Sequence, residues 1–241
     1  MTTGLDGYLG AVVGRLQSIF GGRLVGVYPA GSVALDAYIQ GRSDVDLVAV
    51  ASGFTVAEVE AVVAALDHDA LPCPARGLEF VLYDRSVLAG LTTEAGFALN
   101  LNTGAGLPYK AEIGYSGGPA FWYPIDRDIV RQQRRALLGP PFPDLMTRVR
   151  YRELLPVVAE SVASHRAFIG DHGVNAVLNG CRALRYFTER TWYPKRAAAA
   201  WALDRLPSEA PVVQAALDDV VDRSAAADFL AKVHAIVTTS R

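Results

Sequence analysis

The sequence predicts an α/β or α+β first part followed by an all-helical second part, and three features of its 241 residues lead to this fold class. Strand and helix patterns alternate over the first ninety residues. A proline-rich stretch, LGPPFPDL at 138–145, then interrupts them, as is typical of a domain boundary. Every later pattern is helical, and alanine-rich runs such as RAAAAWALDRL have strong helix propensity. We therefore expect one domain over 1–146 and a helical bundle domain over 147–241.

The elements of the first domain follow from periodicity and from glycine positions. Residues 6–20 carry apolar side chains at helical spacing, with Asp6 as the expected N-cap and a glycine pair at the end. The same reasoning predicts strands at 24–28, 44–50 and 77–83, a helical turn at 33–38, and helices at 55–66 and 125–138.

Residues 96–124 differ from the segments around them, because they are rich in Gly, Pro, Asn and Tyr. Such a composition is more typical of an ordered functional loop or an irregular extension than of a sheet core. Beyond the proline-rich break, the periodicity predicts helices at 147–169, 174–191, 195–206 and 211–238.

Composition limits the kind of protein and its partners. The chain is 51% hydrophobic and 20% charged, which is typical of a soluble globular protein, and its net charge of −2 gives no electrostatic basis for nucleic-acid binding. No apolar run approaches the length of a membrane span, and the N-terminus lacks the pattern of a signal peptide. The two cysteines, Cys73 and Cys181, are far apart and suit a reducing compartment. We expect a cytoplasmic monomer that binds neither nucleic acid nor membrane.

The stretch GSVALDAYIQGRSDVDLVAV, residues 31–50, places two acids at the start of a strand. Side chains alternate along a strand, so Asp44 and Asp46 share a face, about 7 Å apart along the chain. Two carboxylates so close repel each other unless a cation lies beside them, and magnesium prefers such hard oxygen ligands.

A Gly-Ser pair precedes these acids. Gly31 and Ser32 follow the strand at 24–28, at the start of the expected helical turn, and eleven residues, 33–43, separate them from Asp44. A turn of small residues at a helix start presents backbone N–H groups and a hydroxyl to an anion. The sequence thus predicts a phosphate cradle and a metal clamp in one segment.

A third acid, Glu79, lies in the middle of the apolar strand at 77–83. It could serve as a third metal ligand, or as the base that deprotonates an acceptor hydroxyl. Each feature also has an ordinary structural interpretation: a lone Gly-Ser is usually a turn, and a lone Asp-x-Asp is usually a pair of surface acids. The order of strand, Gly-Ser, helical turn, Asp-x-Asp strand and acidic strand favours a functional site.

This arrangement resembles the signature of the nucleotidyltransferase superfamily. The C-terminal stretch NAVLNGCRALRYFTERTWYPKRAAAAWALDRLP, residues 175–207, resembles the aminoglycoside adenylyltransferases that act on spectinomycin and streptomycin. The resemblance implies a nucleotidyltransferase domain with a mixed sheet, followed by the helical bundle. It also implies magnesium as the cofactor, ATP as a co-substrate and a small cationic aminoglycoside-like acceptor.

The resemblance also implies roles for single residues. Ser32, Ser43 and Lys195 would contact the nucleotide phosphates. Asp44 and Asp46 would hold magnesium, with Glu79 as the catalytic base. Asp128 matches a further aspartate of the family that we assign to the nucleotide, and Asp126 lies two residues before it.

Three residues are predicted to contact the acceptor. Asp126 and Asp171 are acids that would suit a polycation, and Asp171 matches a substrate-contacting acid of the family. Streptomycin-modifying members carry a tryptophan after a Phe-Gly-Glu segment. The comparable stretch here is FALN, 97–100, which ends in Asn100 and contains no tryptophan.

The sequence therefore favours an enzyme that transfers AMP from MgATP to a hydroxyl of an aminoglycoside or aminocyclitol antibiotic and releases pyrophosphate. One alternative keeps the chemistry but uses a protein or RNA acceptor. Another is a regulatory module that binds nucleotide without turnover, although such a module needs the phosphate cradle and not three carboxylates.

Overall fold

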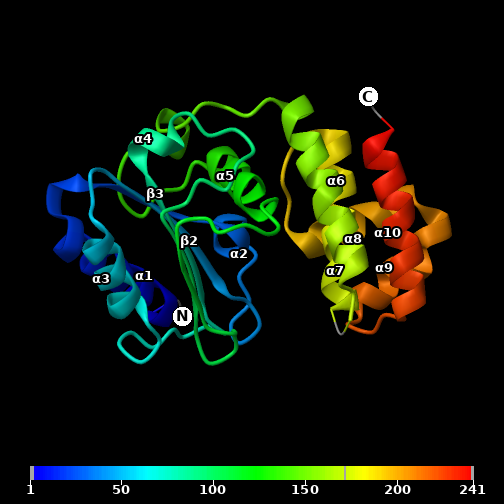
Figure 1. Cartoon of the computed structure of the whole chain (residues 1–241). Coiled ribbons are helices and arrows are strands. Elements are labelled where there is room, and N and C mark those ends of the chain that lie inside the picture. Colours follow the sequence, from blue (N-terminus) through cyan, green and yellow to red (C-terminus); the bar gives the residue numbers. More distant parts are fainter. Residues whose placement is uncertain (1–2, 171, 240–241) are drawn as a thin grey trace. The chain divides into compact units, whose positions relative to one another are not determined.

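The computed structural model describes residues 3–170 and 172–239 (Figure 1). The chain forms two compact units, Met1–Arg148 and Val149–Arg241. The first unit contains all the strands of the described residues, and the second is helical.

A five-stranded sheet organises the first unit, with its strands side by side in chain order. β2 and β3 run parallel, whereas the pairs β1–β2, β3–β4 and β4–β5 are antiparallel. The predicted mixed sheet is therefore confirmed. The strands are β1 (Leu24–Pro29), β2 (Val45–Ala51), β3 (Leu78–Asp84), β4 (Leu99–Thr103) and β5 (Lys110–Ile113).

One face of the sheet packs on the apolar stripes of α1 (Thr3–Phe20) and α3 (Val56–Leu66) (Figure 1). α3 begins with a capping box, in which Thr55 and Glu58 each bond the other's backbone N–H and so satisfy donors at the helix start. Alternation along the strands gives this face its core residues, Val45, Leu47, Ala49, Leu78, Phe80, Leu82, Leu99 and Leu101. Burial of these side chains holds the sheet against the two helices.

The opposite face carries polar side chains in one line across four strands. Asp46 pairs with Glu79, Glu79 with Asn102, and Asn102 with Lys110, so all four side chains share a face. We call these four residues the polar row. The sheet thus separates an apolar side that maintains the fold from a side available for chemistry.

Helix α5 (Trp122–Gln133) contributes to this second face through a buried arginine. The guanidinium of Arg127, fully buried, donates to the hydroxyl of Tyr83 at 3.0 Å and to the carbonyl oxygens of Thr92, Glu94 and Ala95. A buried cation is tolerated only with such a set of acceptors. Arg127 therefore fixes the loop at 92–95 to β3 and α5.

Several predictions for the first unit are wrong. Asp6 lies inside α1, which starts at Thr3, and the helical turn expected at 33–38 is α2, Gly31–Ala34. Residues 96–124 contain β4 and β5, because Leu99, Leu101 and Thr103 alternate with asparagines and pair with β3. The helix expected at 125–138 spans Trp122–Gln133, since Arg134 adopts a left-handed conformation. The chain then bonds to β1, where Val27 pairs with Leu138. The first unit also contains η1 (Gly21–Arg23), α2 (Gly31–Ala34), α4 (Arg85–Leu88) and η2 (Phe142–Asp144).

The second unit is a bundle of helices, as the sequence predicts. It contains α6 (Tyr151–Ala167), α7 (Gly173–Glu189), α8 (Lys195–Arg205), η3 (Pro207–Glu209), α9 (Ala210–Leu217) and α10 (Arg223–Thr238). α7 and α10 approach closely at Gly180, where an added Cβ would lie 2.9 Å from atoms of both Leu230 and Phe229. A side chain at position 180 would therefore force Leu230 and Phe229 to shift.

The single helix expected over 211–238 is wrong. The chain breaks between α9 and α10, where Asp219 adopts a left-handed conformation with φ of 63°. Asp222 then caps α10 by accepting a hydrogen bond from the N–H of Ala225. The first predicted helix of the bundle also begins later, at Tyr151 instead of 147.

Candidate active site

The Gly-Ser turn, Gly31 and Ser32, packs directly on Asp46, the second residue of β2. The chain leaves β1 at Pro29, and the N–H of Ala30 donates to the carbonyl oxygen of Asp46 at 2.8 Å. Gly31 has φ of +47°, and an added Cβ would lie 1.9 Å from Oδ2 of Asp46. A side chain at position 31 would therefore occupy the place of this carboxylate. The structure brings together the two halves that the sequence predicts as cradle and clamp.

Ser32 is the second residue of α2, and its hydroxyl is buried without a hydrogen-bond partner among the residues that the structure describes. A buried hydroxyl normally has a partner, so this one is suited to donate to a ligand oxygen. Unlike the Ser32 hydroxyl, the Ser43 hydroxyl has a hydrogen-bond partner within the protein. Its Oγ accepts from the N–H of Ile39 at 3.0 Å and closes the loop before β2, which leaves its O–H available to donate.

Glu79 pairs in register with Asp46 on the parallel strand, with Asp44 and Asp126 close enough to act on it electrostatically. Burial, followed by the charge of Asp46, raises the pKa of Glu79 well above the ordinary range of a glutamate. Asp46 and Glu79 are thus paired near the start of β2 and β3, and Asp44 lies two residues before Asp46. Such a raised pKa is typical of groups that carry or accept protons in a reaction.

The oxygen donors of this trio fit magnesium by chemistry, since carboxylates and hydroxyls are its usual protein ligands. Gly31 packs closely against the Asp46 carboxylate, and the hydroxyl of the next residue, Ser32, is buried without a partner among the described residues. Across residues 3–170 and 172–239, no three His, Cys, Asp and Glu side chains lie close enough to hold a metal ion. The three-carboxylate ligand set therefore stays a prediction.

The two aspartates of α5 have different surroundings. Asp128 is buried, and its carboxylate accepts from Arg131 at 2.8 Å and from Gln132 at 3.0 Å, both on the same helix. Asp126 is half-buried and acts on Glu79. The geometry thus associates Asp126 with the acids of the sheet, whereas both oxygens of Asp128 already accept hydrogen bonds within α5.

β4 supplies two asparagines to the same face. Asn100 is buried and donates to the hydroxyl of Tyr123 at 3.0 Å. Asn102 lies directly opposite Glu79, where paired Cβ atoms are about 5 Å apart. Asn102 is not among the residues predicted from the sequence. Its signal is the alternation of apolar and Asn residues in LNLNT, which also resembles loop composition.

The second unit holds the remaining predicted residues. Lys195 begins α8, and its Nζ donates to Oδ1 of Asn175 at 2.8 Å. Asp171, predicted to contact the acceptor, lies outside the described residues.

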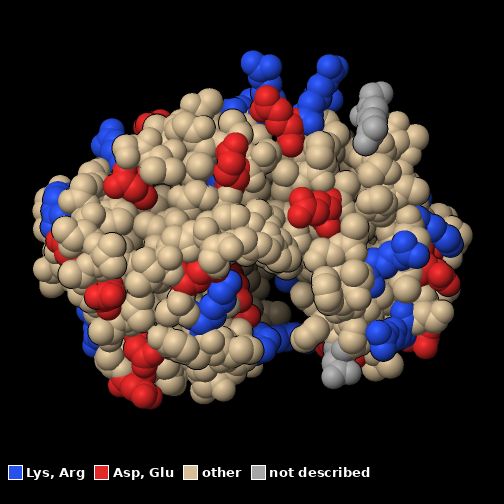
Figure 2. Space-filling model, viewed as in Figure 1, with Lys and Arg blue, Asp and Glu red and all other residues tan. Residues whose placement is uncertain are grey.

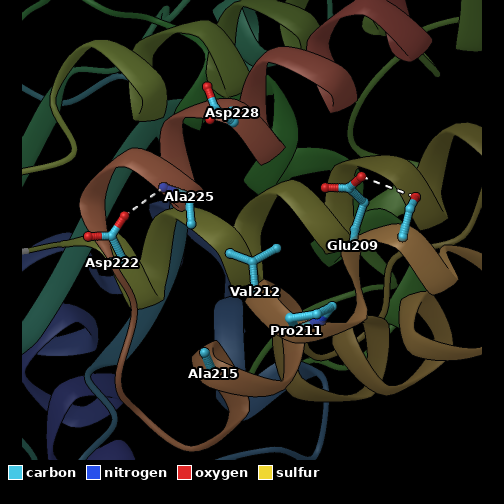
Figure 3. A pocket seen from close by; sticks show the side chains of 8 residues that line it. Glu209, Pro211, Val212, Ala215, Asp222, Ala225 and Asp228 are labelled. Atoms are coloured by element: carbon cyan, nitrogen blue, oxygen red, sulfur yellow. Dashed lines mark hydrogen bonds between the residues drawn. The ribbon is translucent and has the colours of Figure 1, made fainter.

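A shallow pocket of about 330 Å³ lies between η3, α9 and the start of α10, among Glu209, Asp222 and Asp228 (Figure 3). Glu209 is bonded to Ser208, and Asp222 caps α10, so these acids serve the local structure. On the face seen in Figure 2, Lys and Arg are interspersed with Asp and Glu. No helix of the described residues is both long enough and apolar enough to span a bilayer.

Residues 144–239 match the family model of the aminoglycoside adenylyltransferase C-terminal domain. The family resemblance predicted from the sequence is thereby confirmed. No curated protein sequence matches the chain.

The fold of the whole chain is similar to that of a known structure. The crystal structure of the spectinomycin adenyltransferase AAD(9) from Enterococcus faecialis, with ATP and spectinomycin, matches 97% of this chain and 99% of its own, with a TM-score of 0.69 and 13% identity. At that identity the likeness shows the fold alone. The CD-NTase CdnG from Bradyrhizobium diazoefficiens, in complex with GTP, matches 97% of this chain and 82% of its own, with 14% identity and a TM-score of 0.33, too low to support an argument.

Proposed function

Since residues 144–239 belong to the C-terminal domains of the aminoglycoside adenylyltransferase family, we propose that this chain transfers AMP from MgATP to a hydroxyl of an aminoglycoside or aminocyclitol antibiotic. Pyrophosphate is the second product. The observation that carries the proposal is the close approach of Gly31 to Asp46, which pairs in register with Glu79 on the neighbouring strand. We place this activity in the cytoplasm, with the chain acting as a monomer.

Each group has a chemical task in this proposal. Gly31 lets the backbone approach a phosphate closely, and the Ser32 hydroxyl donates to a phosphate oxygen. Asp44 and Asp46 hold magnesium, which neutralises charge on the triphosphate when it is bound.

Glu79 is proposed to take the proton of the acceptor hydroxyl. The hydroxyl oxygen bonds to the α-phosphorus as the bond to the bridging oxygen breaks, and pyrophosphate leaves. Glu79 acts as a base in its ionised form, which the charge of magnesium at Asp46 would favour against the burial and the negative charge that raise its pKa. Asp126 and Asn100, together with Asp171, are proposed to contact the cationic acceptor, and Asp128 and Ser43 to support the nucleotide site.

A protein or RNA acceptor is the alternative within the same chemistry, and a nucleotide-binding module without turnover is the alternative outside it. Incubating the chain with labelled ATP, magnesium and a panel of aminoglycosides and aminocyclitols separates the three. We expect labelled AMP on at least one antibiotic and equimolar pyrophosphate. Binding of ATP without transfer to any antibiotic, protein or RNA would favour the regulatory module.

The Glu79→Gln variant is expected to lower kcat by roughly 10²-fold or more, because an amide cannot accept the proton. Its unfolding temperature should not fall, since the substitution removes a buried carboxyl from beside Asp46 and Asp44. Steady-state kinetics and thermal unfolding of the same preparation check both expectations. A destabilised Glu79→Gln protein with full kcat would make Glu79 a structural residue instead.

The Lys195→Ala variant is expected to raise the KM for ATP roughly tenfold and to lower kcat, because a phosphate loses a point charge. Stability should change little, because the bond to Asn175 is exposed. Lys232→Ala is the matched control, since Lys232 also bonds a side-chain oxygen of its own unit, that of Glu209 at 2.6 Å. The same KM for ATP in both variants and the wild type would exclude Lys195 from the nucleotide site.

A further inference from the structure

His165 lies at one end of a chain of hydrogen bonds that leads to two cations of the second unit. It projects from α6 towards α7, where its Nε2 lies 3.1 Å from Nδ2 of Asn179. Oδ1 of Asn179 accepts from Arg182 at 2.9 Å. Lys195 bonds Asn175, one turn before Asn179 on the same helix. Neither His165 nor Asn179 has a role in the function proposed above.

The orientation of the Asn179 side chain is determined by its partners. Its Nδ2 lies 3.0 Å from the carbonyl oxygen of Asn175, which can only accept, and its Oδ1 faces the guanidinium of Arg182, which can only donate. Rotating the amide by 180° would place donor against donor at Arg182 and acceptor against acceptor at Asn175. The nitrogen of Asn179 must therefore point towards His165.

This orientation also determines the state of the histidine. Because Asn179 offers a donor, Nε2 of His165 has to be an acceptor and carry no proton. The other ring nitrogen, Nδ1, lies 2.6 Å from the carbonyl oxygen of Ser161 and so carries the hydrogen. Burial, with the charges of Lys195 and Arg182, lowers the pKa of His165, in agreement with a neutral ring.

We propose that His165 is a positioning residue for nucleotide binding: as the neutral Nδ1–H tautomer it fixes Asn179, which orients Arg182, and it steadies the turn of α7 that presents Asn175 to Lys195. This inference rests on the proposed role of Lys195 at the ATP phosphates. The acceptor at Nε2 takes the second hydrogen of the Asn179 amide nitrogen; without it the amide keeps only its contacts to Asn175 and Arg182, and its hold on the guanidinium of Arg182 is weaker. The positive charges of Arg182 on α7 and Lys195 on α8 would then be held less firmly in place.

Two substitutions of His165 separate this role from simple packing. His165→Gln places a side-chain amide oxygen near the position of Nε2, whereas His165→Asn places polar atoms only near Nδ1. We expect His165→Asn to raise the Kd for ATP roughly tenfold, measured by calorimetry on the full chain, and to leave kcat at saturating ATP within about twofold. His165→Gln should bind ATP nearly as the wild type does. Thermal unfolding of both variants controls for a general loss of packing.

The tautomer can be measured without any nucleotide. In ¹⁵N spectra at neutral pH, the ring signals that vanish in His165→Gln should show a protonated Nδ1 and an unprotonated Nε2. Protonation at Nε2 would overturn the inference, and so would equal ATP affinity in the wild type and both variants, or equal weakening by Gln and Asn. If the wild type itself binds no ATP, the proposed function fails and the positioning role fails with it. Normal ATP binding by the wild type with unaffected variants refutes the positioning role alone.

Discussion

The Asp46→Asn variant is expected to lose turnover by roughly 10³-fold or more while it unfolds at the same temperature as the wild type or a higher one. A neutral amide cannot replace an anionic ligand of a hard cation, and a metal contributes several kcal/mol to a transition state of this kind. Stability should be retained, because the carboxylate of Asp46 raises the pKa of Glu79 and its removal relieves that repulsion. Loss of activity without loss of stability is the mark of a residue kept for function.

The matched control is Asp84→Asn, at the other end of β3. Asp84 accepts from the N–H of Ser86 at 2.7 Å as the cap of α4, and asparagine caps a helix about as well. Both activity and unfolding temperature should therefore stay near those of the wild type. Single-turnover AMP transfer and calorimetric unfolding give the two measurements. Near-normal transfer by Asp46→Asn would remove Asp46 from the metal site.

The Gly31→Ala variant is expected to lose activity to a similar extent, for a steric reason. The new Cβ would lie 1.9 Å from Oδ2 of Asp46, so this carboxylate has to rotate out of its place beside Glu79. The positive φ of +47° adds about 1–2 kcal/mol of backbone strain for a residue with a side chain. We expect both kcat/KM and the unfolding temperature to fall.

Gly21→Ala isolates the steric effect from the backbone strain. Gly21 has a similar φ of +54°, and an added Cβ there has no atom within 4 Å. This control should show the loss of stability alone, with normal AMP transfer. If Gly31→Ala and Gly21→Ala lose the same small amount of activity, the contact of Gly31 with Asp46 is not needed for catalysis.

Hydrophobic periodicity predicted the helices and strands that show a regular apolar pattern within their own residues. The strands at 24–28, 44–50 and 77–83 and the helix at 55–66 lie within one or two residues of β1, β2, β3 and α3. β4 and β5 were missed because their polar side chains occupy the functional face, and alternation of Leu with Asn resembles loop composition. The break at 218–222 was also missed, because it depends on one left-handed residue and a cap and not on a change in hydrophobicity.

The sequence could place Asp44 and Asp46 on one face of a strand because they are two residues apart. The pairing of Asp46 with Glu79 could not be derived from local periodicity. It depends on the register of two parallel strands, and the two residues lie 33 positions apart in the sequence. The same holds for Asn102, and for Arg127, whose burial depends on carbonyl groups of a distant loop. Residues that act through tertiary contacts leave no periodic signal of their own.

The layout of the polar row separates the proposed chemical groups from the edge of the sheet. Asp46 and Glu79 lie on interior strands, whereas Asn102 and Lys110 continue the row outwards to β4 and the edge strand β5. Substitutions at these two outer positions would change the charge and the hydrogen-bonding groups beside the interior acids and leave Asp46 and Glu79 in place.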